Sequence, residues 1–328
     1  MGRSIMKLSA SELLPVADST GFRVEILEKV IHLLNLLHAL NSHPFLKGKW
    51  VLKGGTALNM FVFNLPRLSV DIDLNYTGAL NREEMLKERQ GVDQALKAVF
   101  SREGLTVRRV PVEHAGGKWR LNYQSFTGQS GNLEVDFNFM FRQPLWDIRK
   151  LDSHPFNGFQ AKNIPVLDIH ELAAGKLSAL LSRRKARDLF DCQMILSMKE
   201  LNRDRLRIAF VVYGAMNRKD WRTVSINDVD VDSAEIAHQL IPTLNSSTTE
   251  ERGTAEEYGK RLIEECRHAL SMVLPFEDNE LEFLNLILDK GRIEPLLLTT
   301  DQELQGRIQC QPLLEWKALN VRRYKGIR

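Results

Sequence analysis

The stretch from residue 52 to residue 75, LKGGTALNMFVFNLPRLSVDIDLN, most constrains the fold of this 328-residue chain. Its two glycines allow a sharp turn in which the backbone can come close to a ligand. The apolar run after them predicts a short helix, capped by Thr56 and stopped by Pro66. Beyond the proline, polar and apolar residues alternate with a period of two, which predicts a β-strand. We therefore expect a strand, a glycine turn, a helix and a second strand in this order.

The predicted strand places Ser69, Asp71 and Asp73 on one face. Neighbouring carboxylates repel each other, so we expect a divalent cation to compensate them. Magnesium suits this role because it binds one or two carboxylates together with substrate phosphates. A helix start preceded by glycines offers backbone N–H groups to such phosphates. The stretch predicts a site for a metal and a nucleoside triphosphate, although a D-x-D motif alone is also typical of a solvated strand edge.

A further acidic group follows on a later predicted strand. Residues 105–112, 118–126 and 131–141 read as successive strands, and the last places Glu134 and Asp136 on one face. If this strand lies beside the D-x-D strand, a third acidic group, Asp136 or Glu134, can reach the same metal. The alternative is the acidic face of an exposed strand.

A second informative stretch begins near residue 169, where Asp168 can cap a helix. Lys176 falls inside the apolar stripe of this helix, so its amine must either reach out to solvent or meet an anion. Because a triphosphate site is predicted upstream, we expect the anion. If the helix continues unbroken, Arg183 and Arg187 line up with Lys176 as a basic track.

Two arginine–aspartate pairs follow at a spacing of four residues. Arg184–Asp188 and Arg187–Asp191 can form salt bridges along a helix. The family resemblance described next implies an alternative, in which Asp188 and Asp191 belong to the site and orient Lys176 or bind the nucleotide.

These two stretches resemble a known family. KGGTALN followed by RLSVDIDLN, and HELAAGKLSALLSRRKARDLFD at 170–191, are similar to the motifs of the AbiEii-type nucleotidyltransferase toxins, distant members of the DNA polymerase β-like nucleotidyltransferase superfamily. The resemblance implies an α+β fold. A nucleotidyltransferase domain with a mixed sheet flanked by helices would span residues 1–160, and a mainly helical domain carrying Lys176 and the RD-x-x-D motif would span 161–328.

The resemblance also implies roles for individual residues. Superfamily members use three carboxylates for magnesium, which places Asp71, Asp73 and Asp136 as metal ligands and, with Lys176, as catalytic residues. The remaining motif positions would bind the nucleotide: Lys53, Gly54, Gly55, Thr56, Arg67, Ser69, Lys176, Asp188 and Asp191.

The activity implied is Mg²⁺-dependent transfer of a nucleoside monophosphate from an NTP, with release of pyrophosphate. The chain would be the toxin of a toxin–antitoxin pair with a cognate antitoxin protein, active in phage defence, and its acceptor would be RNA, in particular the 3′ end of tRNA. The hydroxyl of a protein or small molecule is an alternative acceptor, and an inert nucleotide-binding module is the alternative to an enzyme.

Composition sets wider limits. The net charge of +3 does not by itself indicate a nucleic-acid-binding protein. Cys192, Cys266 and Cys310 are widely spaced and predict reduced thiols in a cytoplasmic protein. No apolar run reaches the ~20 residues that cross a bilayer, so we expect no membrane association. The basic C-terminal stretch could hold single-stranded RNA or be a solvated end: Lys317, Arg322, Arg323, Tyr324, Lys325 and Arg328.

Overall fold

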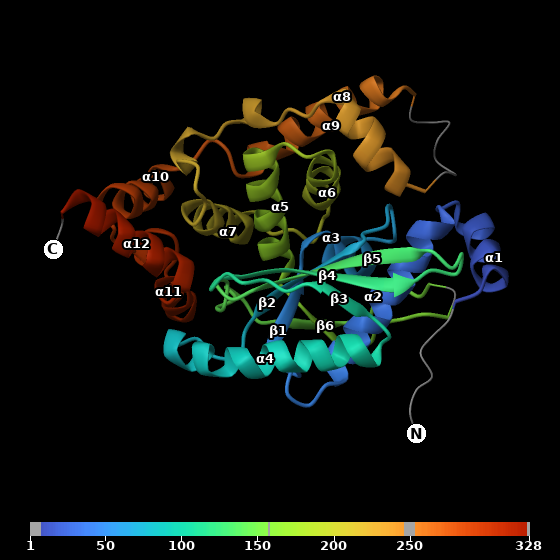
Figure 1. The fold of residues 1–328 in the computed structure, drawn as a ribbon. Helices are drawn as coiled ribbons and strands as arrows, with labels where there is room; N and C mark the ends of the chain where they lie inside the picture. The colour runs from blue at the N-terminus through green and yellow to red at the C-terminus, as the bar shows by residue number, and fades with distance from the viewer. Residues whose placement is uncertain (1–7, 157, 246–252, 327–328) are drawn as a thin grey trace. The chain divides into compact units, whose positions relative to one another are not determined.

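The computed structural model of the protein describes residues 8–156, 158–245 and 253–326 (Figure 1). The chain divides into two compact units, which are considered separately. The first comprises Met1–Arg142, Ile148–Leu167 and Pro242–Glu251, and the second comprises Gln143–Asp147, Asp168–Ile241 and Arg252–Arg328.

The first unit is built on a seven-stranded mixed sheet with the strand order β3-β4-β5-β2-β1-β7-β6. Two neighbouring pairs are parallel, β2 with β5 and β1 with β7, and the other pairs are antiparallel. The strand bounds are Trp50–Lys53 (β1), Asp71–Tyr76 (β2), Thr106–Arg109 (β3), Gly116–Gln124 (β4), Ser130–Asn138 (β5), Arg149–Leu151 (β6) and Ile164–Val166 (β7).

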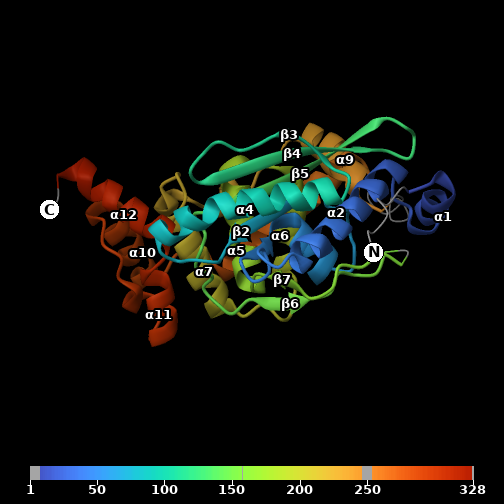
Figure 2. The same ribbon diagram turned by 60° about the horizontal axis from the view of Figure 1, so that its bottom comes forward.

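Alternation along the central strands gives the sheet a buried face and a polar face. In β5, Leu133, Val135 and Phe137 are buried, whereas Glu134 and Asp136 between them are partly exposed. The helices α2 (Val24–Ser42) and α4 (Arg82–Arg102) pack together on the buried face, as Figures 1 and 2 show. The apolar stripes of these helices thus supply the core that positions the sheet.

The remaining helices of the first unit are short. They are α1 (Ala10–Thr20), α3 (Gly54–Ala57) and the π-helical turn η1 (Leu58–Val62), which continues α3. Two details of the sequence interpretation are wrong here. Lys53, not Thr56, is the N-cap residue of α3, and β2 begins at Asp71, so that Ser69 precedes the strand and is buried.

The second unit is built from helices. The α-helices are α5 (Ile169–Arg183), α6 (Ala186–Leu196), α7 (Arg203–Ala215), α8 (Ser233–Glu235), α9 (Ala255–Ala269), α10 (Asp278–Asn285), α11 (Gln302–Gln309) and α12 (Pro312–Lys325). Shorter 3₁₀ or π turns are η2 (Trp221–Thr223), η3 (Ile226–Asp228), η4 (Ile236–Leu240), η7 (Leu270–Met272), η8 (Leu286–Lys290) and η9 (Pro295–Leu297), and the turn η5 (Ile241–Thr243) follows η4. The predicted α+β class, a mixed sheet flanked by helices and followed by a helical C-terminal region, is confirmed.

The continuous basic helix considered for residues 169–191 does not form. α5 ends at Arg183 because Arg184 adopts a left-handed conformation with φ = 52°, and α6 starts a new direction at Ala186. Arg183 and Arg187 therefore do not extend a track from Lys176 along one helix.

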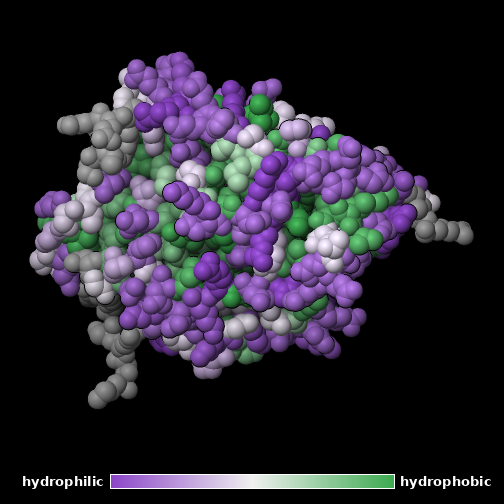
Figure 3. Space-filling model, turned by 180° about the vertical axis from the view of Figure 1, so that it is seen from behind, coloured by the Kyte–Doolittle hydropathy of each residue, from purple (hydrophilic) through white to green (hydrophobic). Residues whose placement is uncertain are grey.

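The surface and the cysteines bear on the compositional predictions. On the face drawn in Figure 3, hydrophilic residues cover most of the surface, with hydrophobic ones showing between them. Within the ranges that the structure describes, no helix combines the length and apolar character needed to span a bilayer. All three cysteines are free thiols, two of them buried and Cys310 exposed.

Candidate active site

Four charged residues line up across the polar face of the central sheet. Antiparallel pairing sets Lys53 of β1 opposite Asp73 of β2, and parallel pairing sets Asp73 beside Asp136 of β5. Antiparallel pairing then sets Asp136 opposite Lys118 of β4. Residues in register on neighbouring strands point to the same face. The sheet thus presents a row of lysine, aspartate, aspartate and lysine, which we call the charged row.

A second row lies one pleat away from the charged row. It joins Asp71 of β2, Glu134 of β5 and Arg120 of β4 by the same registers. Glu134 accepts hydrogen bonds from Lys118 Nζ at 2.8 Å and from Arg120 Nε at 3.0 Å. These two cations hold the pKa of Glu134 below its usual value, with the Lys118 bond as the main cause. Glu134 is therefore committed to ion pairs, which favours Asp136 over Glu134 as the third acid.

Asp136 has a different electrostatic setting. Burial raises its pKa, and the neighbouring charge of Asp73 adds to this effect, while Lys53 and Lys118 oppose it. A carboxylate with a raised pKa is a stronger base at neutral pH than an ordinary aspartate. Asp136 is thus suited to accept a proton from an attacking hydroxyl.

The glycine turn touches the charged row directly. Gly54 has φ = +76°, a conformation that other residues rarely adopt. A Cβ atom at Gly54 would lie 2.2 Å from Asp73 Oδ2. The backbone at the start of α3 is therefore packed against the carboxylate of Asp73. Glycine is needed here for both the turn and this close approach.

The hydroxyl groups predicted to bind phosphate lie inside the unit. Thr56 is fully buried, and its hydroxyl donates to the backbone carbonyl of Asp71 and contacts Ser69 Oγ at 3.0 Å. Arg67 is 2% exposed and donates from Nη1 to the Leu68 carbonyl at 3.0 Å. These contacts tie the loop before β2 to α3 and so fix where the D-x-D strand begins. Their predicted contact with the nucleotide stays a prediction.

Lys176, Asp188 and Asp191 form a compact ion-pair cluster in the second unit. Lys176 Nζ lies 3.0 Å from Asp188 Oδ1 and 2.7 Å from Asp191 Oδ2, and all three side chains are buried. Arg183 also binds Asp188, with Nε at 2.6 Å from Oδ2. Burial acts to raise the pKa of Asp188, but Lys176 and Arg183 outweigh it and leave that pKa lowered.

The ion-pair cluster shows which anions lie next to the amine of Lys176. Within the second unit, Lys176 meets these two carboxylates as its anions, and Asp188 and Asp191 orient its amine. The expected i,i+4 bridge from Arg184 to Asp188 is wrong, because Arg184 Nη2 instead lies 3.4 Å from Asp228 Oδ1. The approach of Lys176 to the strand carboxylates and to a triphosphate stays a prediction.

The C-terminal stretch belongs to α12 up to Lys325, and Arg328 lies outside the described residues. Lys317 donates to the Asn217 carbonyl at 2.5 Å, and Lys325 Nζ lies 3.3 Å from Asp289 Oδ1. Part of this basic charge therefore serves the packing of the helical unit. Trp316 and Tyr324 are 57% and 92% exposed.

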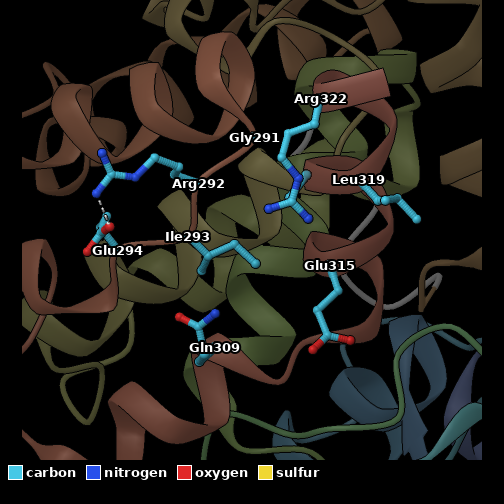
Figure 4. A pocket seen from close by; sticks show the side chains of 9 residues that line it. Gly291, Arg292, Ile293, Glu294, Gln309, Glu315, Leu319 and Arg322 are labelled. Atoms are coloured by element: carbon cyan, nitrogen blue, oxygen red, sulfur yellow. Dashed lines mark hydrogen bonds and ion pairs between the residues drawn. The ribbon is translucent and has the colours of Figure 1, made fainter. Parts of the chain in front are cut away.

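A pocket of about 480 Å³ opens in the second unit beside α12 (Figure 4). Side chains of both signs line it, including Arg322, Glu315 and the ion pair between Arg292 Nη2 and Glu294 Oε1 at 2.6 Å. None of the predicted site residues is among its lining residues. Its mixed charge gives it no clear preference for a nucleotide.

The predicted magnesium site can be tested against the donor set. Within the described ranges, no group of three His, Cys, Asp or Glu side chains is already arranged to hold a metal ion. The charged row nevertheless places two carboxylates side by side on neighbouring strands, with Asp71 on the same face. Carboxylate oxygens are the ligands that Mg²⁺ prefers, and it commonly needs only one or two of them beside substrate phosphates. The residues present therefore fit Mg²⁺ that enters together with a nucleotide.

Comparisons with known proteins identify the family of the chain. Residues 35–284 match the family described as "Nucleotidyl transferase AbiEii toxin, Type IV TA system". The chain therefore belongs to the AbiEii nucleotidyltransferase toxin family: it is a nucleotidyltransferase and the toxin of a type IV toxin–antitoxin system. Membership implies a nucleoside triphosphate substrate and an antitoxin partner, as the motifs had indicated.

A solved structure shows the same fold. The chain is similar to MenT4, a nucleotidyltransferase toxin from Mycobacterium tuberculosis H37Rv, with a TM-score of 0.57 and 18% sequence identity. The match covers 93% of this chain and 99% of that one. None of the curated proteins compared with the chain matches it.

Sequence reasoning missed one member of the charged row. Lys118 lies opposite Asp136, and its pKa is raised, mainly by its hydrogen bond to Glu134, with smaller contributions from Asp71 and Asp73. The alternation KWRLNY of residues 118–123 does place Lys118 and Arg120 on one polar face. It does not tell which strand lies beside that face, and this is why the role was not visible.

Proposed function

We propose that the chain transfers a nucleoside monophosphate from an NTP to an RNA acceptor, the 3′ end of tRNA in particular, and releases pyrophosphate. The observation that carries the proposal is the charged row, in which Asp73 and Asp136 lie side by side between Lys53 and Lys118, with Gly54 packed against Asp73. Acidic side chains beside a glycine turn are what a metal–triphosphate site requires.

The roles follow from position. Asp71, Asp73 and Asp136 would hold Mg²⁺, which when bound offsets the charge of the phosphates and of the leaving pyrophosphate. Lys53 and the backbone of Gly54 and Gly55 would bind the β- and γ-phosphates. Asp136 would accept the proton of the attacking hydroxyl.

The predicted site residues outside the charged row would mainly position its strands and the substrate. Thr56, Ser69 and Arg67 would fix the start of the D-x-D strand through the contacts described above. Lys176, held by Asp188 and Asp191, would present its amine to the triphosphate.

The test is a transfer assay. The purified chain is incubated with Mg²⁺, each labelled NTP in turn, and total RNA or cell lysate. We expect label on RNA of tRNA size. Label on protein or on a small molecule, or label nowhere while NTP binding is intact, would overturn the RNA proposal.

A matched pair of variants ties the activity to the site. Asp73→Asn should abolish transfer and relieve growth inhibition when the chain is expressed without its antitoxin. Asp18→Asn makes the same change on an exposed position of α1 and should leave both intact. Equal activity of the two variants would refute the assignment of Asp73.

A further inference from the structure

A cationic surface borders the charged row on the side of β4 and β3. Lys118 and Arg120 on β4 and Arg109 on β3 share the polar face of the sheet, and we call these three residues the basic sheet edge. The side chains of Lys118 and Arg120 are 52% and 56% exposed, and Arg109 is exposed as well.

The register of the basic sheet edge sets like charges against each other. Arg109 pairs directly with Arg120, because the pairing shifts between Val107 and Arg109. Such a bulge re-aims side chains, and like charges directly opposite each other destabilise a pair of strands. Glu134 binds Lys118 and Arg120, and the carboxylates of the charged row act on Lys118 as well, but the two bonds of Glu134 do not include Arg109. An anionic partner would relieve the remaining repulsion.

The in-line geometry of nucleotidyl transfer indicates which part of the substrates lies at the basic sheet edge. In nucleotidyl transfer the attacking oxygen and the leaving pyrophosphate lie roughly in line, on opposite sides of the phosphorus. If Lys53 and the glycine turn hold the pyrophosphate end on the β1 side, the acceptor approaches the aspartates from the other side. That side is β4 and β3, because the strand order is β3-β4-β5-β2-β1.

We infer that the basic sheet edge binds the phosphate backbone of the polynucleotide acceptor, next to the nucleotide that is extended; this rests on the proposed function. With strands ~4.8 Å apart, Arg109 on β3 lies roughly 10 Å from the strand of Asp136, a separation that a few nucleotides bridge. Arginine and lysine contacts to phosphate position a nucleic acid without reading its sequence. The edge therefore positions the acceptor and does not select it by sequence.

The experiment measures RNA binding apart from catalysis. Binding of a fluorescent single-stranded RNA oligonucleotide is followed by anisotropy, without NTP or Mg²⁺, over a range of salt concentrations. The test variant is Arg109→Glu, because Arg109 is exposed and lies outside the ion pairs of Glu134. The control is Lys87→Glu, an equal charge reversal at an exposed position of α4, on the opposite side of the sheet.

We expect Arg109→Glu to weaken RNA binding about ten-fold and to reduce the salt slope by about 0.7 for each phosphate that the edge no longer neutralises. Lys87→Glu should change the RNA affinity less than two-fold. Arg109→Lys keeps the positive charge and should retain most of the wild-type affinity. Equal affinities for Arg109→Glu and Lys87→Glu would overturn the inference. It would also be overturned if Arg109→Glu weakened NTP binding while RNA binding stayed unchanged.

The two proposals fail in different ways. If wild-type protein labels RNA but Arg109→Glu binds RNA like the control, the edge inference is wrong and the proposed function stands. If wild-type protein labels a protein or a small molecule instead, the proposed function is wrong whatever the RNA affinity. A wild-type chain that does not bind RNA at all overturns the edge inference directly.

Discussion

The contact between Gly54 and Asp73 makes the substitution Gly54→Ala a sharp test of the site. An alanine at φ = +76° costs about 1–2 kcal/mol because of left-handed strain. Its Cβ would also lie 2.2 Å from Asp73 Oδ2. Carbon and oxygen atoms in contact normally stay about 3.5 Å apart, so the carboxylate must move by more than about 1 Å.

The substitution Gly54→Ala should affect the transfer rate more strongly than the stability of the fold. Moving the Asp73 side chain off its preferred rotamer adds about 0.5–1.5 kcal/mol to the cost of the strain. Misplacing a catalytic group by ~1 Å can reduce a rate about 100-fold. We therefore expect Gly54→Ala to lower the free energy of unfolding by about 2–3 kcal/mol and to lower label transfer about 100-fold.

Gly48→Ala supplies the control, because Gly48 has φ = +79° but no atom within 4 Å of an added Cβ. It carries the strain without the collision, so urea denaturation of the two variants separates these contributions. Combining Gly54→Ala with Asp73→Ala should remove most of the cost of the collision, because only the 3.1 Å approach to the Cβ of residue 73 remains. If Gly54→Ala transfers label as well as Gly48→Ala does, the packing of Gly54 against a catalytic carboxylate is refuted.

Three further substitutions test other contacts. Lys176→Met leaves Asp188 and Asp191 buried without the amine between them. Urea denaturation should show that the free energy of unfolding falls by about 3–5 kcal/mol. A change near zero would contradict the ion-pair cluster. Thr56→Val removes a buried hydroxyl bonded to the D-x-D strand and should cost about 1–3 kcal/mol and reduce transfer. Since burial raises the pKa of Asp136, its ionisation opposes folding as the pH rises through that pKa. Asp136→Asn should therefore abolish transfer yet raise the urea midpoint at neutral pH, and this gain should vanish below the pH range in which ordinary aspartates titrate.

The faces of the strands could be predicted from the sequence, but their neighbours could not. Alternation around Asp71, Asp73 and Asp136 depends only on the period of a strand, and it holds in β2 and β5. The parallel register that sets Asp73 beside Asp136 joins segments more than sixty residues apart and depends on the whole sheet. The same dependence hid the position of Lys118.

The surroundings of Lys176 failed to emerge from the sequence for a local reason. Its place in the apolar stripe of α5 indicated that the amine either reaches solvent or meets an anion, for which we expected the triphosphate. The structure pairs the amine with Asp188 and Asp191, and the contact with a triphosphate stays a prediction. The basic track required a continuous helix, whereas the left-handed Arg184 ends α5 and the next helix brings Asp188 and Asp191 to the amine. A single non-glycine residue with positive φ leaves little trace in composition or periodicity.

The two lysines of the charged row bear on how strongly the aspartates need a metal ion. Repulsion between the aspartates was expected to need a divalent cation, but Lys53 and Lys118 flank the pair and oppose the rise in the pKa of Asp136. The two lysines thus offset part of the repulsion, and we expect Mg²⁺ to gain most of its binding energy from the phosphates that it shares with the carboxylates. A ligand raises the melting temperature only in proportion to its binding of the folded state. Millimolar Mg²⁺ alone should leave the melting temperature nearly unchanged, while Mg²⁺ and an NTP together should raise it, and less so in Lys53→Met. A large rise with Mg²⁺ alone would show that the carboxylates form a metal site without the nucleotide.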